Sequence, residues 1–123
     1  FDADNPKAYS IDGPSWVNNH AHVLRPKKEL IEFGYLLHYL NAFNYHGYAN
    51  GTTRLKLTQG AMNSIPVHLP SLGEQKRIVE ALDDHLFRLD KALAEVEAVV
   101  EVAQTLRRSL LHKALTGELL EEK

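Results

Sequence analysis

Apolar residues recur every three or four positions through the second half of the chain. They form the series Val79, Leu82, Leu86, Leu89, Leu93, Val96, Val100, Ala103, Leu110 and Ala114, with Arg107 as the one interruption. This alternation is the heptad pattern of a helix that packs along another helix. Ser71 and Glu74 have the spacing of a capping box, and Thr116-Gly117 supplies a stop signal. The pattern therefore predicts one long helix over residues 71–117, followed by a C-terminal tail at 118–123.

The length of this helix indicates that it needs a partner. About 40 helical residues span roughly 60 Å, whereas a compact domain of this chain length is only about 35 Å across. We expect the helix to pair as a coiled coil through Val79, Leu82, Leu86, Leu89, Leu93, Val96, Val100 and Leu110. The alternative is a core helix of a larger bundle. The pattern does not distinguish parallel from antiparallel pairing.

Residues 1–70 have a mixed pattern. Strand-forming residues with partial alternation predict a strand over 16–24, and a helical period predicts a helix over 28–40. A loop follows over 41–51, then a short helix that Thr58 caps and that runs to about Ser64. Residues 65–69 predict a short edge strand, because Pro66 cannot donate to a ladder. The predicted fold class is α+β, a small mixed α/β domain at 1–70 followed by the long helix.

Composition narrows the function classes. The chain has 123 residues, enough for about one domain, and it contains no cysteine. No apolar run reaches the ~18 residues of a membrane span, so we expect no membrane contact. The lack of cysteine removes disulfides and leaves a cytoplasmic setting as the default expectation. The net charge is -2, but residues 1–70 carry +1 and residues 71–123 carry -3. The chain begins with Phe1 instead of Met, which indicates a piece of a longer protein.

Metal binding and catalysis have little support in the sequence. His20 and His22 would share one face of a strand, and His46 or His68 would be the third ligand. Without cysteines or an HExxH motif, structural or surface histidines are the simpler interpretation. No nucleophile motif or phosphate-binding glycine loop is present. We therefore expect no catalytic residue, no metal and no cofactor in this chain.

The segment Tyr45–Lys56 combines glycines with polar and cationic residues. Threonine hydroxyls donate to phosphates, arginine binds guanine or phosphate, and asparagine pairs with adenine. The candidate DNA-binding residues of this loop are Asn50, Gly51, Thr52, Thr53, Arg54 and Lys56. Lys27 and Lys28, next to Arg25, are candidates for phosphate contacts. The alternatives are an ordinary polar surface loop and a solvated helix start.

Several runs resemble one known family. PSLGEQKRIVEALD (70–83), with its Glu-Gln pair, is similar to the junction that begins the helix of specificity subunits in type I restriction–modification systems. SLLHKALTGEL (109–119) is similar to the end of that helix. WVNNHAHVLRP and GTTRLKLTQGAMNSIPVHLP resemble the later part of the family's target recognition domain. The resemblance covers nearly the whole chain.

The resemblance implies a fold and a function. Such subunits carry two target recognition domains, each of which reads half of a split site in double-stranded DNA, separated by antiparallel spacer helices. They are non-catalytic and dock methyltransferase (M) subunits, which bind S-adenosylmethionine, and through them restriction (R) subunits. We expect this chain to be a C-terminal fragment with part of one recognition domain (1–70) and one spacer (71–117), with the same helix joining two copies as a homodimer.

Two other function classes stay open at this point. One is a coiled-coil oligomerisation or scaffold module without nucleic-acid binding. The other is an enzyme with a histidine metal site.

Overall fold

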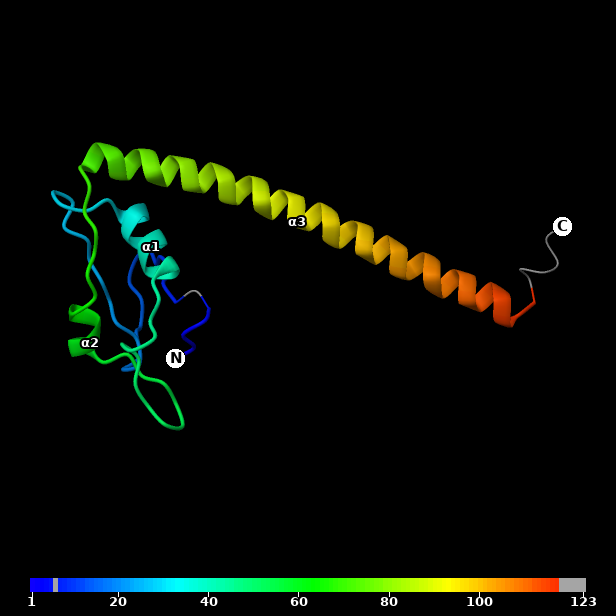
Figure 1. The fold of residues 1–123 in the computed structure, drawn as a ribbon, viewed down its shortest axis with the longest axis horizontal. Helices are drawn as coiled ribbons and strands as arrows, with labels where there is room; N and C mark the ends of the chain where they lie inside the picture. The colour runs from blue at the N-terminus through cyan, green and yellow to red at the C-terminus, as the bar shows by residue number, and fades with distance from the viewer. Residues whose placement is uncertain (6, 118–123) are drawn as a thin grey trace. The chain divides into compact units, whose positions relative to one another are not determined.

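The computed structural model describes residues 1–5 and 7–117, and about half of the chain is helical. The helices are α1 (Phe33–Ala42), α2 (Gln59–Asn63) and α3 (Leu72–Leu115), in the order that Figure 1 shows. The chain divides into two compact units, 1–81 and 82–123. The boundary between the units falls inside α3, so the first turns of this helix belong to the N-terminal unit. The predicted C-terminal tail at 118–123 lies outside the described residues.

The two predicted strands are wrong. Within the described residues, pairing is limited to the isolated bridges His46–Ala49 and Asn50–Lys56. A strand forms only where a neighbouring strand completes its hydrogen-bonding ladder, and segment 16–24 has no such neighbour. Trp16 is 98% exposed, so the residue with the largest apolar surface in that segment is not buried either. The α+β class is therefore not confirmed, and the N-terminal unit consists of loops around two helices.

Helix α1 begins five residues after the predicted start at Lys28. The amides of Leu30 and Ile31 both donate to the carbonyl of Lys27, which closes a separate turn before the helix. The Glu32 carboxylate then accepts the Tyr35 amide at 2.9 Å and caps α1. The spacing of apolar residues did not distinguish this turn from the helix, because Ile31 has the same apolar spacing as the helical residues that follow it.

Tyrosine hydroxyls, and not a neighbouring strand, form hydrogen bonds with the carbonyls of segment 65–69. Tyr35 on α1 donates to the carbonyl of His68 at 2.7 Å, and Tyr39 donates to that of Pro66 at 2.6 Å. The hydroxyls lie one helical turn apart, so they bind carbonyls two residues apart on an extended chain. Segment 65–69 is therefore not a strand, and the tyrosine hydroxyls of α1 bind the carbonyls of Pro66 and His68.

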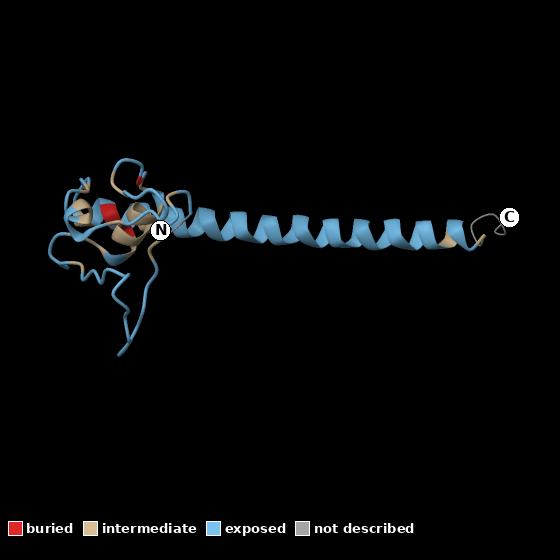
Figure 2. Ribbon diagram, turned by 90° about the horizontal axis from the view of Figure 1, so that it is seen from below, coloured by how far each residue is buried: buried red, intermediate tan, exposed pale blue. Residues whose placement is uncertain are grey.

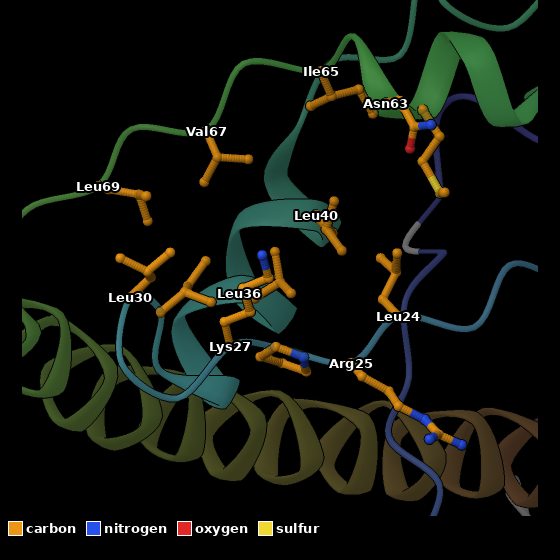
Figure 3. A pocket seen from close by; sticks show the side chains of 13 residues that line it. Leu24, Arg25, Lys27, Leu30, Leu36, Leu40, Asn63, Ile65, Val67 and Leu69 are labelled. Atoms are coloured by element: carbon orange, nitrogen blue, oxygen red, sulfur yellow. The ribbon is translucent and has the colours of Figure 1, made fainter.

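The apolar side chains between α1 and this segment line a small pocket. In Figure 3 the side chains of Val67 and Leu69 face those of Leu30 and Leu36. The pocket is about 290 Å³ and is lined mainly by leucine, isoleucine, valine and methionine. The buried hydrophobic residues of the unit are Tyr35 and Tyr45, and the Tyr45 ring packs edge-on against Phe43, which also packs against Tyr48.

The two other helices begin as predicted. Thr58 Oγ1 accepts the Ala61 amide at 3.2 Å and caps α2. Ser71 Oγ accepts the Glu74 amide at 3.2 Å, which is one half of the predicted capping box. Helix α3 ends at Leu115, and Gly117 has a φ of +79°, the left-handed conformation that ends helices.

Candidate nucleic-acid interface and helix surface

The candidate DNA-binding loop is closed by a two-way backbone bridge. The amide of Asn50 donates to the carbonyl of Lys56 at 3.0 Å, and the Lys56 amide donates to the carbonyl of Asn50 at 2.9 Å. The residues between them, Gly51 to Leu55, are exposed. The bridge therefore brings both ends of the loop together and presents the predicted residues Thr52, Thr53 and Arg54 to solvent.

Gly51 is required by the geometry of this loop. Its φ is +150°, and an added Cβ would lie 2.1 Å from the Arg54 carbonyl oxygen. Because this oxygen belongs to the backbone, it cannot move aside as the end of a flexible side chain can. Gly51 thus permits the tight return of the chain that places Arg54 and Lys56 beside Asn50.

The side chains of Arg54 and Lys56 line a groove in the N-terminal unit. Its cavity is about 970 Å³, and its other walls come from segments 7–11, 17–24 and 33–40. Lys7, His20 and His22 line the same groove, and no Asp or Glu is among its described lining residues. Arg54 and Lys56 are the exposed lysine and arginine of this lining, and they make an anion such as phosphate a suitable ligand.

Lys7 adds a desolvated charge to this groove. Its Nζ is buried without a hydrogen-bond partner, 3.9 Å from an Asp2 carboxylate oxygen and 5.4 Å from the centre of the Phe1 ring. The Asp4 amide and the Asn5 side chain donate to Asp2 and hold the pKa of its carboxyl below its ordinary value. Asp2 is thus an anionic neighbour of the Lys7 ammonium.

Lys27 and Lys28 are not brought into this groove. Both are exposed in the turn before α1, and Lys27 lines the small apolar pocket with Arg25. The predicted phosphate contacts of these two lysines therefore form a separate cationic spot on the N-terminal unit, and their role stays a prediction.

The histidines of the metal alternative are placed apart. His22 Nε2 lies 2.8 Å from the carbonyl oxygen of Leu57, and His46 Nε2 lies 3.4 Å from Asp4. Across the described residues, no group of three or more His, Asp or Glu side chains is arranged to hold a metal ion. His22 instead links segment 17–24 to Leu57, which immediately precedes the Thr58 cap of α2.

Gln75 joins the N-terminal segments to the first turn of α3. Its side chain is fully buried. Its Oε1 accepts the Glu32 amide at 2.8 Å, and its Nε2 donates to the carbonyls of Leu30 at 3.0 Å and Pro70 at 2.8 Å. The prediction of site residues did not include Gln75. The signal was present, because Gln75 lies four positions before Val79 and continues the heptad series with a polar residue.

The predicted pairing residues fall into two groups. Val79 lies against Gly34 of α1, where an added Cβ would be 2.9 Å from Val79 Cγ1. The other seven residues, from Leu82 to Leu110, are exposed, and Leu89 exposes 64% of its surface. Nearly all of α3 beyond Ala81 has the colour of exposed residues in Figure 2. None of the described helices has the length and apolarity to cross a membrane.

Comparisons with known proteins all identify the same family. The family described as "Type I restriction modification DNA specificity domain" matches residues 3–98. A putative type I restriction enzyme specificity subunit of Haemophilus influenzae is 40% identical over 78 residues, which cover 61% of this chain and 20% of that protein. The EcoKI specificity subunit of Escherichia coli is 30% identical over 104 residues, or 81% of this chain and 22% of that protein.

These matches cover most of this chain but only a small part of each relative. The EcoDI specificity subunit of Escherichia coli, 31% identical over 101 residues, is matched over 82% of this chain and 23% of its own length. The chain thus spans about a fifth of the length of the curated relatives it matches. No solved structure matches the chain significantly.

Proposed function

The chain belongs to the family of type I restriction–modification DNA specificity domains, and on this premise we propose that it recognises double-stranded DNA sequence-specifically, as the non-catalytic specificity part of a type I restriction–modification complex. The observation that carries the proposal is the groove lined by the exposed side chains of Arg54 and Lys56, because its described lining residues include no carboxylate. Phosphate is the ligand that such a lining favours.

The closed loop supplies the contacts that distinguish bases. Arg54 donates to a guanine edge or a phosphate, and Asn50 pairs with adenine. Thr52 and Thr53 donate to phosphates and fix the register of the loop on the duplex. The exposure of Thr52, Thr53 and Arg54, and the Asn50–Lys56 bridge that holds the loop closed, support this division of roles. Lys27 and Lys28 contribute phosphate contacts from their separate position.

Helix α3 acts as the spacer and as a docking element. Its 44 residues correspond to roughly 66 Å, and its exposed apolar series needs to be covered by another helix. We propose that a second copy of the chain covers it, and that methyltransferase and restriction subunits complete the complex. S-adenosylmethionine then binds the methyltransferase subunit, and the complex acts on DNA in the cytoplasm.

A scaffold module without nucleic-acid binding would use the same exposed apolar series on α3, but the family match favours DNA recognition over it. A salt titration of duplex DNA binding separates the two, because neutralising phosphates makes affinity fall steeply with salt. We expect the purified chain to bind duplex DNA with such a slope, and Arg54→Ala to reduce both affinity and slope. Lys91→Ala, on an exposed face of α3, is the matched control. A chain that binds no duplex DNA at low salt would contradict the DNA-binding proposal.

A further inference from the structure

The loop that carries the candidate DNA-binding residues also contains a reactive pair of residues. Asn50 is the one asparagine of the sequence that a glycine follows. The backbone nitrogen of the next residue can attack an asparagine amide, and glycine leaves that nitrogen unshielded because it has no side chain. Asn50 and Gly51 are both exposed, in a loop that extends beyond the two short helices (Figure 1). The pair is therefore a candidate for deamidation in the folded chain.

The hydrogen bonds of the loop hold neither of the groups that react. The backbone amide and carbonyl of Asn50 are bound to Lys56, at 3.0 and 2.9 Å, but the Asn50 side chain takes part in no hydrogen bond with a described residue. The Gly51 amide donates to no described acceptor either. The attacking nitrogen has to lose its proton to solvent, and an amide without an acceptor loses it more readily than a bonded one.

Asn63 is a matched comparison within the same chain. It is exposed, the small residue Ser64 follows it, and its side chain also lacks a hydrogen bond to any described residue. The Ser64 amide, however, donates to the Ala61 carbonyl at 3.1 Å where α2 ends. The serine side chain shields the same nitrogen. Asn50 thus differs from Asn63 in the nitrogen that would attack, and not in the exposure of its own amide.

We propose that Asn50 deamidates spontaneously in the native chain, and that this modification weakens DNA recognition by the loop. The Gly51 nitrogen attacks Asn50 Cγ, the bond between Cγ and Nδ2 breaks, and ammonia leaves with the proton of the Gly51 amide. The product is a cyclic imide. Water opens this imide at either carbonyl carbon, which gives aspartate with the original backbone or isoaspartate with a backbone that runs through the side chain. The reaction consumes water and needs no other reactant.

Both products remove contacts that the loop supplies. An asparagine amide donates and accepts at an adenine edge, whereas a carboxylate only accepts. Residue 50 lies opposite Lys56 in an antiparallel bridge, and opposite residues of such a pair have their side chains on one face. The new carboxylate therefore competes with phosphate for Lys56. In isoaspartate, the carbonyl that accepts the Lys56 amide also becomes part of a free carboxylate, and the bridge changes.

Peptide mapping of aged protein tests the chemistry. The full chain is incubated under native conditions in mildly alkaline buffer and digested at acidic pH. Mass spectrometry then measures the amide remaining at Asn50 and Asn63, and enzymatic methylation of isoaspartyl carboxylates counts isoaspartate. We expect residue 50 to convert first, with isoaspartate among the products, while Asn63 keeps its amide. Conversion of Asn63 as fast as Asn50, or an Asn50 that keeps its amide through prolonged incubation, overturns the proposal.

Duplex DNA binding by the same samples tests the consequence, which rests on the proposed function. We expect the affinity of the wild type to fall with the converted fraction, and Asn50→Asp to weaken binding about tenfold. Asn50→Gln, whatever its initial affinity, should keep that affinity with age, because the longer side chain closes a larger ring more slowly. Asn63→Gln, outside the loop, is the matched control and should age as the wild type does.

The outcomes separate the two proposals. Protein with a converted residue 50 and full DNA affinity overturns the effect on recognition. Fresh wild type that binds no duplex overturns the proposed function and this effect with it, whereas the mass measurement involves no DNA and decides the deamidation by itself.

Discussion

The Oε1 atom of Gln75 accepts the Glu32 amide at 2.8 Å, which ties the residue that caps α1 to the first turn of α3. The Nε2 atom of the same side chain donates to Leu30 and Pro70, so one buried amide satisfies three backbone groups. Because the Gln75 side chain is fully buried, its own amide depends on these three backbone partners. The glutamine of the family-like Glu-Gln pair therefore has a structural explanation in this chain.

Gln75→Ala should be among the most destabilising single changes in the N-terminal unit. It leaves the Glu32 amide and two carbonyls without partners in a buried site, and we expect a loss of about 2–4 kcal/mol in the free energy of unfolding. Urea denaturation followed by circular dichroism measures this loss. Gln104→Ala, an exposed glutamine of the same helix, should change stability by less than about 0.5 kcal/mol. Equal effects of the two substitutions would contradict the role of the buried amide.

Gly51→Ala should disable the loop without unfolding the chain. The new methyl group would overlap the Arg54 carbonyl oxygen, so the loop cannot keep the Asn50–Lys56 bridge. We expect DNA affinity to fall at least as far as with Arg54→Ala, while the melting temperature changes little because the loop is exposed. Gly60→Ala in α2 is the control, since its Cβ meets open space and alanine favours a helix. Full DNA affinity of the Gly51→Ala variant would show that this loop does not recognise DNA.

The contact of Gly34 with Val79 should appear as energetic coupling. Gly34→Ala places a methyl group 2.9 Å from Val79 Cγ1 and should cost about 1–3 kcal/mol in stability. Removing the valine methyl groups with Val79→Ala makes room for it. A double-mutant cycle should therefore give a loss smaller than the sum of the two single losses by about 1 kcal/mol. Additive losses would mean that the two residues do not touch.

Tyr45 should make the stability of the N-terminal unit fall at alkaline pH. Burial raises the pKa of the Tyr45 hydroxyl above its ordinary value of 10.0, and this hydroxyl donates to the Leu40 carbonyl at 2.6 Å. The folded state therefore holds the proton after the unfolded state has lost it. The stabilisation is complete below pH 10 and is lost as the pH rises through the raised pKa. The unfolding free energies of the wild type and Tyr45→Phe should differ by a constant amount below pH 10, and the wild type should lose stability relative to the variant above it. A difference that stays constant through the alkaline range would exclude this role.

Helices α2 and α3 were predictable because their signals are local. Thr58 and Ser71 cap them as expected, and the heptad series runs through α3 without a break in the helix. The start of α1 was harder to predict, because the turn at Lys27 depends on backbone hydrogen bonds that the apolar period does not reveal.

The two predicted strands failed because strand formation depends on distant partners. Residues 65–69 have the composition of an edge strand, but the hydroxyls of Tyr35 and Tyr39, about 30 positions away, bind their carbonyls. The pattern likewise placed Arg54 and Lys56 in one loop without indicating that Lys7 lines the same groove. That arrangement arises from the way loops pack, which has no period in the sequence.

Selection of bound sequences from a pool of randomised DNA duplexes, carried out with the wild-type chain and with Arg54→Ala, is the sharpest test of DNA recognition by this loop. We expect the wild type to enrich one short sequence, and Arg54→Ala to lose the preference at one or two positions of it, because one arginine reads one base pair or its neighbour. Recovery of an unenriched pool by the wild type, or the same enriched sequence with both proteins, would contradict the assignment of DNA recognition to this loop.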